Sequence, residues 1–162
     1  MTEKEMFMNT WQKEFGTTMK VLKQMPEDKA GFRPAADKAR SAKELATVFI
    51  QELGVVDGVV KGKIDFGGQM PSFATWGDLL KGFESKHKEM VSKVQAMSEA
   101  DYNAKITAPV GPKQMGEVRR ADMLWMMLHD SIHHRGQFSV YLRLAGAKVP
   151  SIYGPSGDEP WM

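Results

Sequence analysis

The stretch Asp122–Ala145, DMLWMMLHDSIHHRGQFSVYLRLA, carries three of the four histidines of this 162-residue chain within one long helical pattern. On a helix, side chains four positions apart lie on one face, so the stretch offers two candidate ligand pairs. One pair is His129 with His133, and the other is Asp130 with His134. The two pairs point about 100° apart, so only one of them can face a given interior site.

Apolar side chains recur in this stretch at steps of three and four, which is typical of the core-facing side of a helix. The expected stripe comprises Met123, Met127, Asp130, His134, Gln137 or Phe138, and Tyr141. A buried carboxylate is costly unless it is paired or bound to a cation, and a carboxylate with an imidazole suits zinc or nickel. The stripe therefore favours Asp130 and His134 as metal ligands, although a buried pair that only orders the core remains the alternative.

The composition predicts one globular domain over residues 1–162. Hydrophobic residues make up 42% and charged residues 26% of the chain, which is ordinary for such a domain. The net charge is only +2, with Lys and Arg scattered among acids. A nucleic-acid partner is therefore not expected, because that function needs a basic stripe.

Cysteine is absent from the chain, which excludes disulfides and a thiol nucleophile and fits a reducing, cytoplasmic location. The N-terminal segment Met1–Glu5 lacks the pattern of a signal peptide. No apolar run approaches the roughly 18 residues of a membrane-spanning helix. We therefore expect a cytoplasmic protein with no membrane partner.

Capping signals and apolar periodicity predict four helices and a tail. The helices are expected at about residues 3–24, 42–60, 76–97 and 121–145, followed by a C-terminal tail at 147–162. With no convincing strand, these helices indicate an all-α four-helix bundle. The segment Tyr102–Val118 could be extended, but its prolines and glycines argue against a regular sheet. His87 is expected at the edge of the core and not as a ligand.

Three regions of the chain resemble the DinB family. The most specific is the end of the last helix, HHRGQFSVYLR at His133–Arg143, followed by VPSIYG at Val149–Gly154. Ser41–Leu53 resembles the second helix of the family, and Thr75–His87 resembles the third. Together these regions extend the resemblance over essentially the whole chain.

The resemblance implies a four-helix bundle with up-down-down-up topology, and members are often dimeric. It also implies one divalent metal, usually zinc or nickel, between the second and fourth helices. Several relatives are metal-dependent transferases or isomerases that use low-molecular-weight thiols. In these relatives the fourth helix supplies an acidic residue or His and, four residues later, a His. Aligned on Arg135–Gly136, that pair is Asp130 and His134.

One position departs from the family pattern. The remaining family ligand is a histidine early in the second helix, in a pattern like Leu-Ala-x-His, and here Val48 stands at that place. Glu52, one turn later on the same face, could replace it, with Gln51 as a poorer substitute. The alternatives are that Glu52 is a solvated or salt-bridged surface acid, that His129 or His133 turns inward, or that the metal site is lost.

The resemblance leads to two expectations of function. The first is a metal-dependent enzyme of the thiol-transferase type, in which His133 or His129 carries a proton and Arg135 anchors an anion or serves a structural ion pair. The second is a non-catalytic bundle that binds a small ligand. A homodimer is expected in either case, because aromatic side chains such as Trp76, Trp125 and Trp161 suit an interface.

Overall fold

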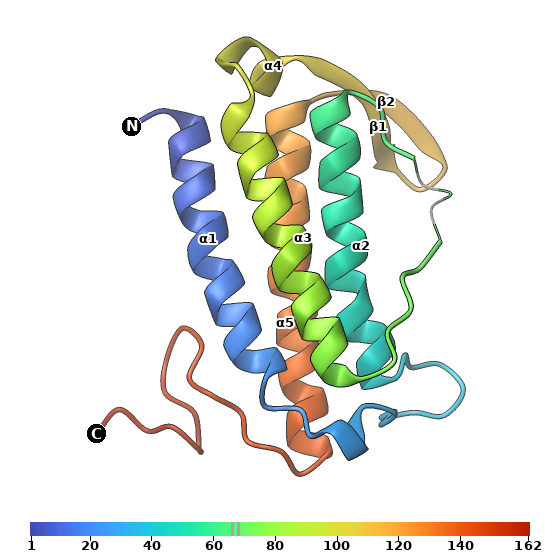
Figure 1. Ribbon diagram of the computed structural model, residues 1–162, viewed down its shortest axis with the longest axis vertical. Coiled ribbons are helices and arrows are strands. Elements are labelled where there is room, and N and C mark those ends of the chain that lie inside the picture. The colour runs from blue at the N-terminus through green and yellow to red at the C-terminus, as the bar shows by residue number, and fades with distance from the viewer. Residues whose placement is uncertain (66, 68) are drawn as a thin grey trace.

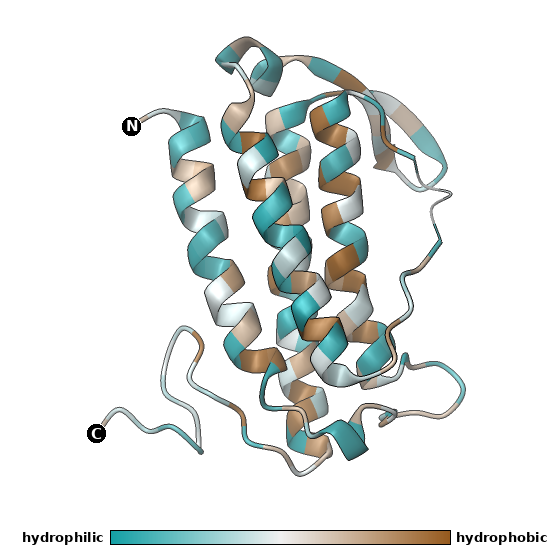
Figure 2. Cartoon of the chain, in the orientation of Figure 1, coloured by the Kyte–Doolittle hydropathy of each residue, from teal (hydrophilic) through white to brown (hydrophobic). Residues whose placement is uncertain are grey.

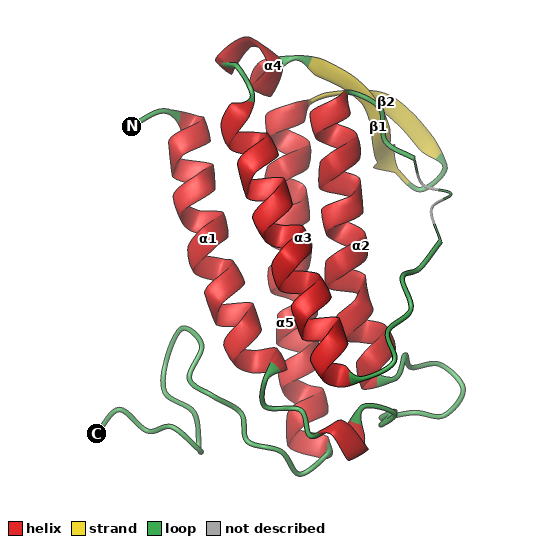
Figure 3. Cartoon of the chain, in the orientation of Figure 1, coloured by secondary structure: helices red, strands yellow, loops and turns green. Residues whose placement is uncertain are grey.

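The computed structural model describes residues 1–65, 67 and 69–162 of the chain. Four long helices form its body: α1 (Glu3–Leu22), α2 (Ala42–Lys61), α3 (Trp76–Ala96) and α5 (Arg120–Leu144). The shorter elements are a 3-10 turn (Glu27–Lys29), α4 (Glu99–Asn103), β1 (Lys105–Gly111) and β2 (Gln114–Arg119). Figure 3 shows that helix dominates the molecule and that the two strands lie at one end of it.

The direction of the helices gives the up-down-down-up topology expected from the resemblance. In Figure 1, α1 and α5 run one way along the bundle, whereas α2 and α3 both run the other way. The end of α2 and the start of α3 therefore lie at opposite ends of the bundle. Helix α2 packs against both α3 and α5, and α1 completes the bundle against the same two helices. The predicted all-α four-helix bundle is confirmed.

Local capping chemistry explains where the helices begin and end. Three N-termini carry capping boxes, formed by Thr2 with Glu5, Ser41 with Glu44, and Thr75 with Asp78. In each box two backbone N–H groups that lack a helical partner are satisfied by side chains. Glycine follows two helices with positive φ, at Gly62 (78°) and Gly146 (76°), as a left-handed C-terminal cap requires.

The core lies between the helices and is rich in aromatic rings. Hydrophobic and hydrophilic residues are mixed along α2 and α3, as expected for amphipathic helices (Figure 2). Trp76 belongs to this core: it is 4% exposed, stacks on Phe138, and donates its indole N–H to the Leu22 carbonyl. Trp76 is therefore not a surface residue left over for an interface, as the argument for a dimer had assumed.

The segment between α4 and α5 is extended and pairs as a two-stranded β-hairpin, although its prolines and glycines had argued against a sheet. β1 and β2 pair in antiparallel register, with Ile106 opposite Val118 and Pro109 opposite Met115. A register shift follows between Pro109 and Gly111. In a two-stranded ribbon each strand keeps one open edge, so a proline can be accommodated there. Ile106 is buried and anchors the hairpin on the bundle.

The C-terminal tail packs on its own bundle, which is one of the two placements that the sequence left open. Lys20 of α1 binds the Glu159 carboxylate at 2.6 Å and the Ser151 carbonyl at 3.3 Å. The tail also sends the hydroxyl of Tyr153 toward α1, whereas Trp161 stays 63% exposed. Within the described residues, none of the helices combines the length and the apolar character that a bilayer crossing requires.

Candidate metal site

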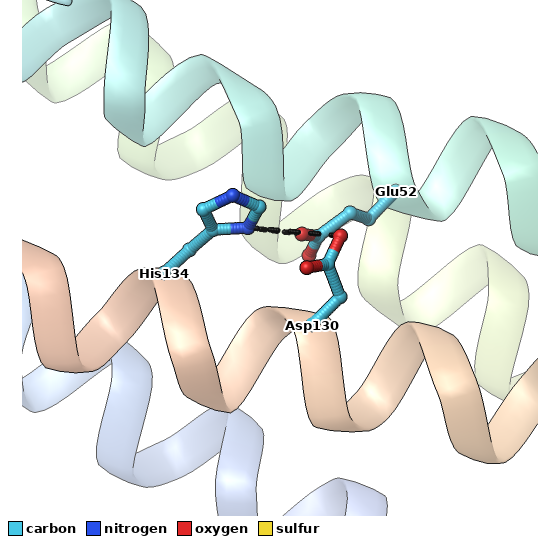
Figure 4. A group of neighbouring side chains, drawn as sticks. All are labelled: Glu52, Asp130 and His134. Atoms are coloured by element: carbon cyan, nitrogen blue, oxygen red, sulfur yellow. Dashed lines mark hydrogen bonds and ion pairs between the residues drawn. The ribbon is translucent and has the colours of Figure 1, made fainter. Parts of the chain in front are cut away.

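Three potential ligands meet at the middle of the interface between α2 and α5. Glu52 comes from α2, and Asp130 and His134 come from successive turns of α5 (Figure 4). One ligand atom from each of the three side chains lies within 4.8 Å of the others. The three side chains point toward one another across the interface. The four-residue spacing on α5 thus places its two donors opposite a single carboxylate on α2.

Glu52 is a buried residue and not a solvated surface acid. It is 7% exposed, and its Oε1 lies 2.6 Å from Nδ1 of His134. Burial raises the pKa of the Glu52 carboxyl to about 7, because a charged carboxylate loses its hydration there, although the hydrogen bond to His134 opposes the shift. The same hydrogen bond raises the pKa of His134 against the effect of burial. A cation bound here would compete with the proton that this pair holds.

Asp130 lies at the solvent side of the group. Its side chain is 46% exposed, whereas that of His134 is 12% exposed, and its Oδ2 lies 3.9 Å from Nδ1 of His134. The core stripe of α5 therefore runs beside Asp130 and not through it. The buried positions of the helix are Ala121, Met123, Leu124, Leu128, Arg135, Phe138 and Leu142.

The donor set fits a divalent metal ion. Oε2 of Glu52 is buried and has no hydrogen-bond partner among the described residues. Leaving a buried charged acceptor unsatisfied is costly, and a cation beside it would supply the missing interaction. Two carboxylates and one imidazole are donors that zinc and nickel accept. The site supplies three protein ligands, the number typical of catalytic zinc sites that keep one position open.

A surface hollow leads to this group. Its volume is about 510 Å³, and it is lined by α2, α5 and the link that follows α2. Glu52, Asp130 and Val48 all line it. Val48, which stands where the family pattern has a histidine, therefore lies beside the ligand group. The hollow gives solvent and small molecules a route to the carboxylates.

The two neighbouring histidines of α5 lie outside the group. His129 and His133 are both exposed. His133 bonds through Nε2 to the side-chain amide of Gln137 at 2.9 Å, and its ring centre lies 5.5 Å from that of His134. Neither His129 nor His133 turned inward as a ligand, and their catalytic roles remain predictions.

Arg135 points to the opposite side of α5. It is 1% exposed, and its guanidinium binds the carboxylate of Glu14 on α1 at 2.6 Å. Tyr153 of the tail accepts a second bond from it at 2.6 Å and donates to Glu14 at 2.8 Å. With these partners, Arg135 serves the structural ion pair, and a role as anchor for an anionic substrate has no support from its position.

Sequence reasoning did not identify Glu14 as a core position. The signal was present in the heptad spacing of α1, because Trp11, Glu14, Thr18 and Val21 recur at steps of three and four and are all buried. An acid in such a stripe indicates a buried cationic partner. The partner, Arg135, lies more than a hundred residues further along the chain, so only the packed fold reveals it.

Comparison with known proteins points to one family. The sequence model of the DinB family matches residues 1–161. A DinB-like protein of Bacillus subtilis, YjoA, superposes with a TM-score of 0.71 at 16% identity, covering 91% of this chain and 97% of that one. A DinB-like protein of Bacillus cereus gives a TM-score of 0.71 at 21% identity, covering 92% and 97%. At these identities the two structures show a shared fold.

A curated relative matches over a short stretch. The uncharacterized protein YrdA of Bacillus subtilis is 40% identical over 43 residues, which is 26% of this chain and 26% of YrdA. The match therefore spans about a quarter of that relative's length.

Proposed function

The chain belongs to the DinB family, and on that premise we propose that it is a metal-dependent enzyme of the thiol-transferase type. The observation that carries the proposal is the convergence of Glu52, Asp130 and His134 within 4.8 Å. The buried Oε2 of Glu52, which has no partner in the described part of the chain, supports it. Zinc or nickel suits these donors best.

Each residue has a defined part in this proposal. Glu52, Asp130 and His134 would hold the ion, which when bound would act as a Lewis acid and lower the pKa of a thiol at its open position. His133 directly precedes His134, and His129 directly precedes Asp130; both are exposed. One of them would take up or return a proton on the solvent side of the site. The hollow beside Val48 would admit a small thiol and an electrophile.

A second candidate function is a metal-free bundle that binds a small ligand or serves a structural role. The observation that favours it is the bond of 2.6 Å between Glu52 and His134, since the two side chains already satisfy each other in part. The half-exposed carboxylate of Asp130 needs no cation, and Val48 cannot ligate one. In this function the three side chains would only order the interface between α2 and α5.

Elemental analysis of protein purified without an affinity tag separates the two functions. Near-stoichiometric zinc, nickel, manganese or iron supports the enzyme, provided that it falls to background in the Glu52→Gln variant. Background metal in both proteins, together with no heat of binding on titration with Zn²⁺ or Ni²⁺, supports the metal-free bundle. The Gln51→Ala variant is a matched control, because Gln51 lines the same hollow without belonging to the ligand group.

A further inference from the structure

Helix α3 places a second histidine in the interior, away from the ligand group. His87 is 6% exposed, and its ring stacks on Phe15 at 3.7 Å between centres and meets the edge of Trp11 at 4.8 Å. Burial lowers the pKa of His87 to about 4, so the imidazole is neutral near pH 7. Yet Nε2 of His87 has no hydrogen-bond partner among the residues described.

A small cavity has His87 and Glu52, one of the three candidate ligands, on its wall. Its volume is about 20 Å³, and all four long helices contribute to its walls. Most of the lining is apolar or aromatic; the polar residues in it are Glu14, Glu52, His87 and Ser131. The cavity is too small for an organic substrate. It does exceed the roughly 10–15 Å³ that a single water molecule needs.

The two unpartnered atoms belong to residues on the wall of this same cavity. They are Oε2 of Glu52 and Nε2 of His87, and both side chains are more than nine-tenths buried. Buried polar groups in folded proteins are nearly always hydrogen-bonded to protein or to ordered water. One is an acceptor, and a neutral imidazole nitrogen can be a donor, so a water molecule between them can satisfy both.

We propose that this cavity is a binding site for one internal water molecule, which accepts a hydrogen bond from Nε2 of His87 and donates one to Oε2 of Glu52. His87 is then a positioning residue that acts through this water on a metal ligand. The inference deepens the proposed function, because the effect on metal binding rests on Glu52 being a ligand. Ser131, also on the cavity wall, offers the water a further partner.

The consequence is a fixed direction for the Glu52 carboxylate. The water would donate to one lone pair of Oε2 and leave the other lone pair of the carboxylate oxygen for the ion, so the water would restrict the rotation of the carboxylate when the ion is bound. Hydrogen-bond partners that orient metal ligands typically change metal affinity by about 10–100-fold when they are lost. His87 would therefore affect the metal without touching it.

The test combines structure with metal affinity. Crystal structures of the metal-free parent and of His87→Phe should show density for one water bonded to both atoms in the parent and none in the variant. Zn²⁺ affinity, measured by competition with a chelator, should fall about 10-fold in His87→Phe. It should be largely retained in His87→Gln, whose amide can still donate. Leu128→Met is the packing control, because it changes the same cavity wall at nearly constant volume.

Several results would overturn the proposal. A dry cavity in the parent removes the water site itself. Equal Zn²⁺ affinity in the parent and in a folded His87→Phe variant removes the positioning role, as does an equal loss in His87→Gln or in Leu128→Met. If the parent binds no metal at all, the proposed function fails together with the positioning role. The density in the cavity then still decides whether the water site exists.

Discussion

His134 and Arg135 are adjacent on α5, yet they serve two different charged clusters inside the bundle. His134 faces α2, where it meets Glu52 with its Oε2 unpartnered in the described chain, and Asp130 at the solvent edge. Arg135 faces α1, where the Glu14 carboxylate and the Tyr153 hydroxyl bind it at 2.6 Å each. The first cluster opens onto a hollow, whereas the guanidinium at the centre of the second is buried and bonded to α1 and the tail.

The difference shows how a buried charge can be assigned a role. A cluster whose donors and acceptors are all engaged has nothing left to offer a ligand, so its effect is on stability and specificity of packing. A cluster that keeps a free acceptor and a path to solvent is available for a cation. The α1 side of α5 is therefore structural, and the α2 side is the candidate site.

The largest expected effect is a loss of stability at the Arg135–Glu14 pair, on the α1 side of α5. Arg135→Ala leaves Glu14 buried without its cation and should lower the free energy of unfolding by about 3–5 kcal/mol, measured by urea denaturation. The double variant Glu14→Leu with Arg135→Met should recover much of the loss, because apolar replacement of a buried pair is often neutral. A loss below about 1 kcal/mol in Arg135→Ala, the range of an exposed ion pair, would contradict the structural role assigned to the Arg135–Glu14 pair.

His87 offers a pH test on a buried group that belongs to neither cluster. Its pKa of about 4 in the folded protein lies below the ordinary value of 6.5, so the unfolded chain binds the proton first as pH falls. The stability is therefore complete above about pH 6.5 and decreases toward pH 4, by up to about 3 kcal/mol. Subtracting the profile of His87→Phe isolates this contribution. Parallel profiles of the two proteins would exclude it.

At the Glu52–Asp130–His134 group, on the α2 side of α5, the expected effect is on metal affinity and not on stability. Glu52→Gln removes a charged ligand and should weaken Zn²⁺ binding by about 100-fold or more, beyond the range for an indirect partner. Asp130→Asn should weaken binding less, because Asp130 is half exposed and can be replaced by water. Isothermal titration measures both variants. A larger loss for Asp130→Asn than for Glu52→Gln would contradict the assignment of Glu52 as the central ligand.

Adding a fourth potential ligand should increase the metal affinity of the Glu52–Asp130–His134 group. Val48 lines the hollow beside Glu52 and Asp130, so Val48→His supplies an imidazole next to the existing donors and should tighten Zn²⁺ binding by about 10-fold. Val48→Leu controls for the change in volume. Equal affinity of Val48→His and the parent would mean that Glu52 already completes the site.

The smallest effect concerns the outer face of the last helix and the tail. Val140, Leu144, Tyr153 and Trp161 are all more than half exposed, and a homodimer would bury such groups if they form one surface. Light scattering over a dilution series should give a mass of twice the 18.1 kDa of one chain. A mass of one chain at every concentration would exclude the dimer. Trp161→Ala should weaken the association if the tail takes part.

Local signals in the sequence predicted the helices well. The capping residues Thr2, Ser41 and Thr75 each begin a helix where expected, and Gly146 ends the last one. These signals work because a cap is a contact between residues three positions apart. The same reasoning gave two candidate pairs on α5, Asp130–His134 and His129–His133, since four residues on a helix define a face. The apolar stripe that favoured the first pair does not run through Asp130 in the structure, whereas the resemblance to the DinB family pointed to the same pair.

The sequence left the partners of these faces undecided. It allowed Glu52 to be either a ligand or a surface acid, and it allowed Arg135 to bind either an anion or a carboxylate of the chain. It also predicted irregular structure at the hairpin, since Pro109 looks incompatible with a sheet until the strand is known to have an open edge. In each case the answer depends on which element packs opposite, and that information is spread over the whole chain.

The sequence by itself therefore determined the four long helices and the two pairs of α5 side chains that share a face, because these follow from local capping and the fixed geometry of a helix. Only the tertiary structure decided that Asp130 and His134 face Glu52, that Arg135 pairs with Glu14 and Tyr153, and that a cavity separates Glu52 from the α3 side. The physical reason is burial. The energy of a charged group depends on how much water and how many partners remain around it, and these are properties of the packed bundle.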